Sequence, residues 1–352
     1  MSGDQAKASI SPAAQLLGCT LERGWRVVQR IETAAKSTGG AFSQSYVVES
    51  DRRAKAFLKA LDLKKAISMA NDVVQALQQM TTAFAFEREV CEKCRRERLS
   101  NVVSILDHGQ FVVDQNDPVS VVPYIIFELG KGDIRSEMAA MDRFDLAWIL
   151  RTLHQVAVGM KQLHSRDIAH QDLKPSNVVV ISKALSKIAD LGCASVKGAT
   201  CPRDDLAVAG ALPYAPPEQL YNHVDPDWSR RRLGCDLYLL GNLVVFFFTG
   251  VSMTSLLAEE VEPTHRWSVT RESYKTALPY VRDAFGRAVE RFADDVPDIV
   301  RADLTLIVRQ LCDPDPNLRG HPANRLSNRF SLERYVSIFD TLTRKAELNL
   351  LR

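Results

Sequence analysis

The strongest constraint on the fold of this chain is the string HQDLKPSN at residues 170–177, which the string DLG follows at residues 190–192. Strand-like runs adjoin the two strings, at residues 177–181 and 186–189. Two such runs separated by a short turn predict a β-hairpin. The hairpin would bring the polar residues at the outer ends of its arms together, so the two strings are expected to form one site.

The polar residues of this site have the chemistry of phosphoryl transfer. Asp172 is a carboxylate that can orient an attacking hydroxyl, and Lys174 is a cation that can neutralise a transferring phosphate. Asn177 and Asp190 supply the oxygen ligands that Mg²⁺ prefers. The sequence therefore predicts a phosphoryl-transfer centre.

In residue order and spacing, the two strings resemble the catalytic loop and the magnesium loop of the protein kinase family. The resemblance covers about residues 25–340. It implies that Asp172, Lys174 and Asn177 are catalytic residues, and that Asn177 and Asp190 hold the metal. It also implies that ATP and Mg²⁺ are the cofactors.

The order of strand-like and helical patterns agrees with this resemblance. Strand-like runs lie at residues 25–31, 44–49, 55–60, 105–113 and 121–128. A helical pattern covers residues 63–99, and the chain is mostly helical beyond the turn at residues 130–132. We therefore expect an α+β, bilobal protein-kinase-like fold, with a small antiparallel-sheet N-lobe that carries one main helix and a mainly helical C-lobe. The expected parts are a flexible lead-in (1–22), the N-lobe (23–130), the C-lobe (131–345) and a C-terminal tail (346–352).

Residues 38–46 lie between the first two expected strands, where the family has a glycine-rich loop over the ATP phosphates. Small residues let backbone N–H groups approach phosphate oxygens. Gly40 and Phe42 keep the family pattern, whereas Thr38 and Ser43 replace glycines. The resemblance implies that Gly40 and Phe42 bind the nucleotide, although the same residues alone would be an ordinary hairpin turn.

Lys59 resembles the strand lysine that holds the α- and β-phosphates of ATP. The family pairs this lysine with a glutamate of the following helix, and the register of residues 86–90 selects Glu89. The gap between lysine and glutamate is longer than usual, so Glu87 and Glu92 remain open.

Residues 124–130 resemble the linker between the lobes. The resemblance implies that main-chain groups of Glu128 and Gly130 meet adenine, with Phe127 at the back of that pocket. Taken alone, the stretch would be a buried strand that ends at a glycine turn.

Three charged residues resemble structural elements of protein kinases that small-molecule kinases usually lack. Glu218 corresponds to the end of the activation segment and is expected to form a buried ion pair with Arg319. Asp236 corresponds to the carboxylate that braces the catalytic-loop backbone. Neither Glu218 nor Asp236 is expected to touch ATP.

The chain also departs from the family pattern. Gln171 replaces an arginine that normally binds a phosphate on the activation loop, and glutamine offers no charge-assisted bidentate contact. Ser195 and Thr200 are the only aliphatic hydroxyls between residues 190 and 218, so switching by loop phosphorylation is not expected. Leu191 replaces a phenylalanine, and Ala211 replaces a threonine that hydrogen-bonds near the catalytic aspartate.

Composition gives no strong bias in the choice of partner. The 352 residues are 46% apolar and 25% charged, with a formal net charge of +2, so neither nucleic acid nor a membrane surface is expected as a partner. The seven scattered cysteines are typical of reduced thiols and favour a cytoplasmic location, and the pair Cys91 and Cys94 lacks the further ligands of a metal site. Residues 1–11 lack an apolar signal core, and the longest apolar run, 237–248, predicts a buried helix because it is too short to span a bilayer.

We therefore expect a protein kinase that uses ATP and Mg²⁺ to phosphorylate serine or threonine of a protein substrate, and a regulatory protein could supply its signal. Two alternatives stay open. A nucleotide-binding pseudokinase scaffold is favoured by the degraded glycine loop, Gln171 and Ala211, although every side chain expected to contact metal or phosphate is present. A small-molecule phosphotransferase is disfavoured by Glu218, Asp236 and Arg319.

Overall fold

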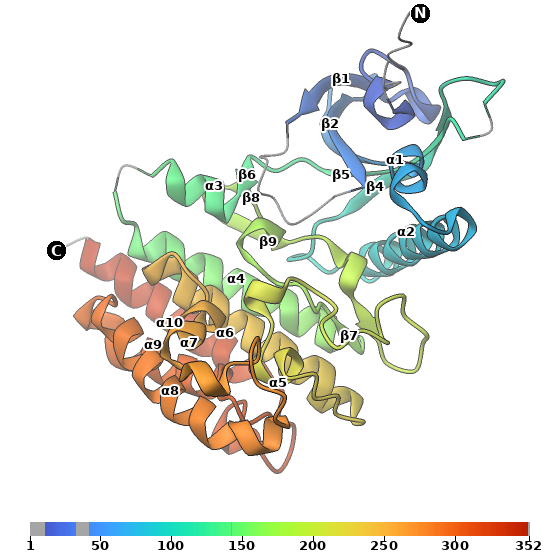
Figure 1. Ribbon diagram of the computed structural model, residues 1–352. Helices are drawn as coiled ribbons and strands as arrows, with labels where there is room; N and C mark the ends of the chain where they lie inside the picture. The colour runs from blue at the N-terminus through green and yellow to red at the C-terminus, as the bar shows by residue number, and fades with distance from the viewer. Residues whose placement is uncertain (1–10, 33–41, 118, 142, 351–352) are drawn as a thin grey trace, which may run out of the picture. The chain divides into compact units, whose positions relative to one another are not determined.

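The computed structural model describes residues 11–32, 42–117, 119–141 and 143–350. The described chain forms two compact units (Figure 1). Unit 1 contains the chain up to Arg96 together with residues 104–130, and unit 2 contains residues 97–103 and the chain from Lys131 onward. We expected residues 97–103 in the N-lobe, but they pack in unit 2, where Val103 N–H donates to the Ile188 carbonyl at 2.8 Å.

Unit 1 is built on one antiparallel sheet with strand order β1-β2-β3-β5-β4. Its strands are β1 (Arg26–Ile31), β2 (Ser43–Glu49), β3 (Lys55–Leu61), β4 (Ile105–Val112) and β5 (Val121–Glu128). Side chains alternate between the two faces of a strand. On β3, Ala56, Leu58 and Ala60 are fully buried in the main apolar cluster of the unit. Lys59 therefore lies on the opposite face of the sheet.

Residues 11–22, which we expected to belong to a flexible lead-in, pack against the buried face of this sheet instead. Ala13 and Leu16 are fully buried in the same cluster as Leu58. The Tyr46 hydroxyl donates to the Ala13 carbonyl at 2.6 Å. The expectation was wrong for this part because the small and apolar residues of the segment cover strand residues that would otherwise face water.

Two helices follow β3 in unit 1, α1 (Leu63–Met69) and α2 (Val73–Arg96). Asp62 caps α1 by accepting from Lys65 N–H at 3.0 Å. The buried residues of α2 are Glu87, Val90, Cys91 and Cys94, all in its second half. This spacing places them on one face of the helix.

Unit 2 is mainly helical. Its helices are α3 (Ile134–Ala139), α4 (Leu146–His164), α5 (Pro217–Leu220), α6 (Gly234–Thr249), α7 (Met253–Glu260), α8 (Tyr274–Asp294), α9 (Asp298–Leu311) and α10 (Glu333–Leu350). Its strands are β6 (Gly132–Asp133), β7 (Ile168–Ala169), β8 (Val178–Ser182), β9 (Leu185–Ile188) and β10 (Ser195–Val196). The small sheets have the orders β6-β8-β9 and β10-β7.

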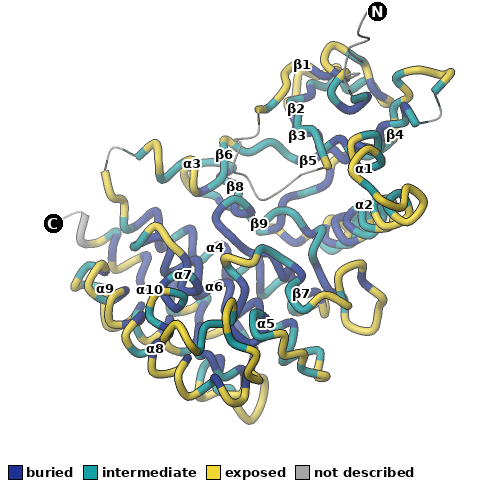
Figure 2. The backbone as a smooth tube through the Cα atoms, viewed as in Figure 1, coloured by how far each residue is buried: buried dark blue, intermediate teal, exposed yellow. Residues whose placement is uncertain are grey.

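Helix α6 forms the centre of unit 2, as its apolar run predicted. Residues Ser229–Thr249 are long and apolar enough to cross a membrane by length and composition alone, but 83% of the most apolar window is buried inside the unit. Figure 2 shows α4 and α6 largely in the colour of buried residues, whereas α8 and α9 have exposed stretches. This burial identifies the helix as a core element.

The last helix extends beyond the C-lobe boundary that we expected at residue 345. Helix α10 continues to Leu350, so most of the expected tail is helical. Ala346 is buried, and Glu347 pairs with Arg151 of α4 at 2.5 Å. Helix α10 therefore packs against α4 for about one turn beyond the boundary that the sequence predicted.

Candidate active site

The catalytic loop of unit 2 places three polar side chains in direct contact. Lys174 Nζ donates to Asp172 Oδ2 at 2.7 Å. Asn177 Nδ2 donates to the same oxygen at 3.1 Å and to the Asp172 carbonyl at 2.8 Å. Ala211 N–H donates to Asp172 Oδ1 at 2.9 Å. The carboxylate is thus held in a fixed orientation, and Oδ1 keeps capacity to accept a further hydroxyl proton.

The backbone just before Asp172 is held by a fully buried carboxylate of α6. Asp236 accepts from the N–H groups of His170 at 2.7 Å and Gln171 at 2.8 Å. Its oxygens also accept from Gln171 Nε2 at 3.0 Å and lie 2.8 Å from His164 Nε2. Gln171 has the left-handed backbone φ of 66°, which is costly for a residue with a side chain. The bonds to Asp236 offset that cost, so the predicted bracing role of Asp236 is confirmed.

His170 connects the catalytic loop to the second string. Asp172 N–H donates to His170 Nδ1 at 3.2 Å, which requires the lone pair on that nitrogen. The ring proton therefore lies on Nε2, which donates to the Ala189 carbonyl at 3.1 Å. The imidazole of His170 thus ties Asp172 to the residue that precedes Asp190.

The predicted hairpin is present and joins the two expected metal ligands. Strands β8 and β9 pair with Val178 opposite Ile188. Outside that pair, Ala189 N–H donates to the Asn177 carbonyl at 2.8 Å. Asn177 and Asp190 consequently leave the same end of the hairpin, and Asp190 has a left-handed φ of 64°.

The donor set at this end of the hairpin fits Mg²⁺. Because Asn177 Nδ2 is bound to Asp172 in two places, the amide is fixed, and its Oδ1, which accepts only a long bond of 3.5 Å from Ser176 Oγ, is the end that can bind a cation. Among the described residues, no three His, Cys, Asp or Glu side chains gather in a way that could hold a metal ion, either here or elsewhere. Magnesium usually takes one or two protein oxygens and completes its shell with phosphates and water. The side-chain oxygens of Asn177 and Asp190 match that coordination pattern.

A second group of site residues lies in unit 1. Lys59 Nζ on β3 donates to both carboxylate oxygens of Glu87 on α2, at 2.7 Å and 2.9 Å. The Glu87 side chain is 8% exposed and that of Lys59 25% exposed. The pair therefore holds an ammonium group at the surface of the sheet face that the N-terminal segment does not cover.

The comparison with known proteins agrees with this geometry. The sequence profile of the family described as "Protein kinase domain" matches residues 39–331. The chain belongs to the protein kinase family. The predicted α+β, protein-kinase-like fold is thereby confirmed.

Similar curated proteins are also kinases, at low identity. An Aurora kinase of Debaryomyces hansenii is 27% identical over 36% of this chain. The serine/threonine-protein kinases PTK2 of Candida glabrata and PrkC of Bacillus subtilis are 25% and 24% identical over 56% and 52% of this chain. The matched regions span 30%, 29% and 28% of these three relatives. The chain therefore corresponds to under a third of the length of each.

In this protein kinase, Glu87 and not Glu89 pairs with Lys59, so the prediction of Glu89 was wrong. Successive side chains along an α-helix point in directions that differ by 100°. Glu89 follows Glu87 by two residues, so its side chain points away from the sheet. The Glu89 side chain is 69% exposed and lies 3.9 Å from Arg88. The buried stripe of Glu87, Val90 and Cys91 was a signal in the sequence that could have identified the correct residue.

Of the other residues predicted to bind nucleotide, Phe42, Glu128 and Gly130 belong to unit 1. Gly40 lies outside the described residues. Phe42 is 36% exposed at the start of β2, and its carbonyl accepts from Asp62 N–H at 2.8 Å. Glu128 ends β5, and its carboxylate accepts from Ser104 N–H at 2.7 Å. Gly130 is the last residue of the unit. The nucleotide contacts of Phe42, Glu128 and Gly130 stay predictions.

The predicted ion pair below the activation segment is confirmed. Arg319 donates to the two oxygens of Glu218 at 2.7 Å and 2.9 Å, and its side chain is fully buried. The guanidinium also lies over the Tyr238 ring, 5.1 Å from its centre. Burial lowers the pKa of Arg319, but the adjacent carboxylate outweighs burial and the pKa is raised. The arginine is therefore charged at physiological pH.

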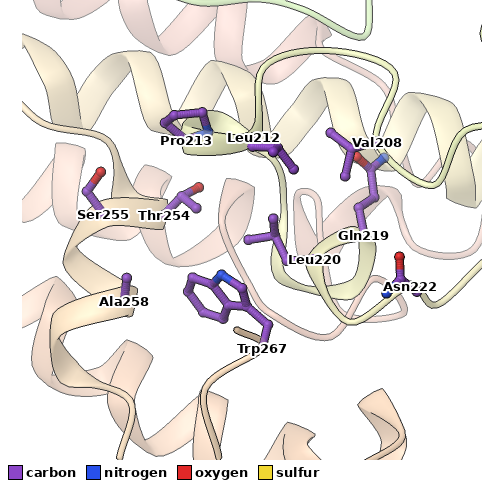
Figure 3. A pocket seen from close by; sticks show the side chains of 10 residues that line it. All are labelled: Val208, Leu212, Pro213, Gln219, Leu220, Asn222, Thr254, Ser255, Ala258 and Trp267. Carbon is purple, nitrogen blue, oxygen red and sulfur yellow. The ribbon is translucent and has the colours of Figure 1, made fainter. Parts of the chain in front are cut away.

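An apolar pocket that the sequence analysis missed lies along the segment that follows Ala211 (Figure 3). Its volume is about 400 Å³, and Figure 3 shows the Trp267 indole across from the segment that carries Leu212 and Pro213. Tyr214, the next residue of that segment, is held by α6, because Asn242 Nδ2 donates to the Tyr214 carbonyl at 2.6 Å. Leu212 directly follows Ala211, whose N–H meets Asp172. One lining residue of the pocket therefore directly follows, in sequence, the residue that contacts Asp172.

The surroundings of Cys193, which directly follows the string DLG, change the pKa of its thiol. Burial, reinforced by the negative charge of Asp172, raises the pKa of the Cys193 thiol to about 12. The group therefore stays a neutral thiol at physiological pH and adds no negative charge next to the expected metal ligands.

Proposed function

We propose that this member of the protein kinase family is an active enzyme that transfers the γ-phosphate of ATP to a serine or threonine hydroxyl of a protein. The observation that supports activity most directly is the contact of Asp172 with both Lys174 and Asn177 in one fixed cluster. A scaffold that had lost catalysis would not need a cation beside a carboxylate in a buried loop, where each charge is costly without the other.

Each residue has a role that follows from its position. Asp172 Oδ1 accepts the proton of the substrate hydroxyl, and Lys174 neutralises the charge that develops on the transferring phosphate. Lys59, oriented by Glu87, holds the α- and β-phosphates. Asn177 and Asp190 would hold Mg²⁺, which supplies charge neutralisation of the phosphates when bound.

The pocket beside Leu212 supports a polypeptide as substrate. A hollow that Leu212, Pro213 and Trp267 line suits an apolar side chain, and it begins next to the residue that contacts Asp172. A peptide whose hydroxyl residue meets Asp172 could place its next side chain there. A small metabolite would have no use for that hollow.

The test is a transfer assay with the purified protein, labelled ATP and Mg²⁺, alone and with a cell lysate, followed by mass spectrometry of the modified residues. We expect phosphoserine or phosphothreonine that depends on Mg²⁺ and disappears with Asp172→Ala. Binding of ATP without any transfer would favour a pseudokinase scaffold instead. Modification confined to tyrosine would refute the choice of acceptor.

A further inference from the structure

Arg232 is a buried cation that has no part in the proposed chemistry. It lies in the π-helical turn Ser229–Leu233 ahead of α6, and it is 1% exposed. Its Nη2 donates to Asp204 Oδ1 at 2.8 Å and to the Asp204 carbonyl at 3.0 Å. A guanidinium removed from water needs an anion to offset its lost hydration. Asp204, in the segment between β10 and α5, supplies that anion.

Asp204 in turn organises the segment that carries it. Its Oδ1 also accepts from Ser195 Oγ at 2.9 Å, and Oδ2 accepts from Cys201 N–H at 3.3 Å. Ser195 is itself buried, and its hydroxyl accepts from Trp228 Nε1 at 3.0 Å. The carboxylate therefore closes the loop from Ser195 to Asp204, and the serine that could have been modified is already engaged on both sides.

The same arginine touches the catalytic loop. Arg232 Nη1 donates to Gln171 Oε1 at 3.2 Å, and Gln171 Nε2 donates back to the Arg232 carbonyl at 2.8 Å. Gln171 directly precedes Asp172. One guanidinium thus joins the middle of the segment to the residue next to the catalytic carboxylate.

Downstream of Asp204 the segment returns to Asp172. Arg231 donates to the carbonyls of Asp204 at 2.6 Å and of Leu206 at 3.0 Å. The return is close, because a Cβ added at Gly210 would lie 2.3 Å from the Gln171 carbonyl oxygen. Residues 204–211 are consequently held at one end by Arg232 and at the other by the bond between Ala211 and Asp172.

We propose that Asp204 and Arg232 form a permanent clamp, built from the two side chains alone, that holds residues 204–211 in the arrangement in which Ala211 orients Asp172. Asp204 and Arg232 are positioning residues in this account. The effect of the clamp on catalysis rests on the proposed function, whereas its effect on the order of the segment does not. No covalent modification of the segment is needed, because the anion that the buried cation requires is encoded in the chain.

Hydrogen–deuterium exchange on the intact protein tests the clamp without relying on activity. Asp204→Asn keeps the shape of the side chain but removes the charge, and it should raise exchange of the amides in residues 201–211 by about tenfold or more. Exchange in α4 should stay unchanged. The matched control is Asp205→Asn, which removes the same charge from an exposed neighbour and should leave both regions as in the wild type.

Transfer kinetics supply the second measurement. Asp204→Asn should lower kcat by about tenfold to a hundredfold while the KM for ATP changes by less than about twofold, because the nucleotide-binding residues are untouched. Asp204→Glu keeps the charge and should restore most of both the rate and the protection from exchange.

Unchanged exchange of residues 201–211 in Asp204→Asn would overturn the clamp, as would an equal effect of Asp205→Asn. Exchange that rises equally in α4 would also overturn it, because it would show a general loss of stability in place of a local one. A wild-type protein that transfers no phosphate would refute the proposed function, and the exchange result would still decide whether the clamp exists.

Discussion

The two groups of site residues are assembled in opposite ways. In unit 2, Asp172, Lys174 and Asn177 lie within one short stretch of chain and contact one another directly. In unit 1, Lys59 and Glu87 come from a strand and a helix that are 28 residues apart in sequence. The Lys174 side chain is 3% exposed, and that of Lys59 is 25% exposed. A local cluster fixes its geometry through its own backbone, whereas a distant pair depends on how a helix is rotated.

The largest expected effect tests the local cluster. Asp172→Ala should lower phosphoryl transfer by about a thousandfold or more, because it removes the group that we propose accepts the hydroxyl proton. ATP binding, measured by titration with a fluorescent analogue, should stay nearly intact.

Asp190→Ala is the matched variant, since it removes a carboxylate from the other string of the same site. It should lose Mg²⁺-dependent binding of ATP, which Asp172→Ala keeps. Wild-type transfer by a contaminant-free Asp172→Ala protein would show that the catalytic assignment is wrong.

The second prediction tests how much the buried ion pair of Glu218 with Arg319 stabilises unit 2. Glu218→Ala or Arg319→Ala leaves a buried charge without its partner and should lower the free energy of unfolding by roughly 3–5 kcal/mol. The double variant should lose much less than the sum of the two single losses. Thermal and denaturant unfolding would measure all three, and strictly additive losses would mean that the pair contributes no coupling.

The third prediction concerns the distant pair of unit 1. Glu87→Gln weakens the hold on Lys59 and should reduce kcat/KM for ATP by roughly tenfold, a modest loss because the lysine is partly exposed to water. Glu89→Gln, on the opposite face of α2, is the control and should change it by less than about twofold. A larger loss in the Glu89 variant would reverse the assignment.

A smaller effect is expected in the activation segment. Replacing Ser195 and Thr200 together by alanine should change turnover by less than about tenfold, or under ~1.4 kcal/mol in the barrier, because the anion that holds the segment is Asp204. A loss of several hundredfold that Asp or Glu at either position restores would show that phosphorylation of the segment controls activity after all.

The last prediction concerns the reactivity of Cys193 and involves no change in phosphoryl transfer. With its pKa raised to about 12, the thiol ionises far less at pH 8 than an ordinary cysteine, whose pKa is 9.0. Iodoacetamide at pH 8 should therefore label Cys193 about a thousandfold more slowly than a free thiol of ordinary pKa. Peptide mass spectrometry would measure the rate, and rapid labelling would contradict the environment described for the catalytic loop.

Contacts between residues that are close in sequence, or that belong to strings of fixed spacing, were easier to predict than contacts between distant residues. The hairpin, the contacts of Asp172 with Lys174 and Asn177, and the pair of Glu218 with Arg319 follow strings of fixed spacing, and the structure contains each of them. Lys59 forms its ion pair with a glutamate of the following helix, as expected. Which glutamate it pairs with depends on how α2 is rotated about its axis. The motif register selected Glu89, whereas the buried stripe of the helix contains Glu87.

The clamp could not have been predicted in this way. Asp204 and Arg232 also lie 28 residues apart, but Asp204 occupies irregular backbone and Arg232 a π-helical turn, so no shared periodic pattern relates one side chain to the other. The burial of Arg232 depends on the packing of the segment as a whole. The same holds for the packing of residues 11–22, whose weak periodicity concealed a close fit to the sheet.

The four donors that converge on Asp236 have a consequence for mutational tolerance. Asparagine at this position would present an amide group to donors that need an acceptor, and glutamate would be too long for a fully buried position. Among the twenty amino acids, aspartate alone matches both the volume and the pattern of acceptors. In a saturation library selected for folded protein, position 236 should therefore reject substitutions as strictly as position 172 does in one selected for activity.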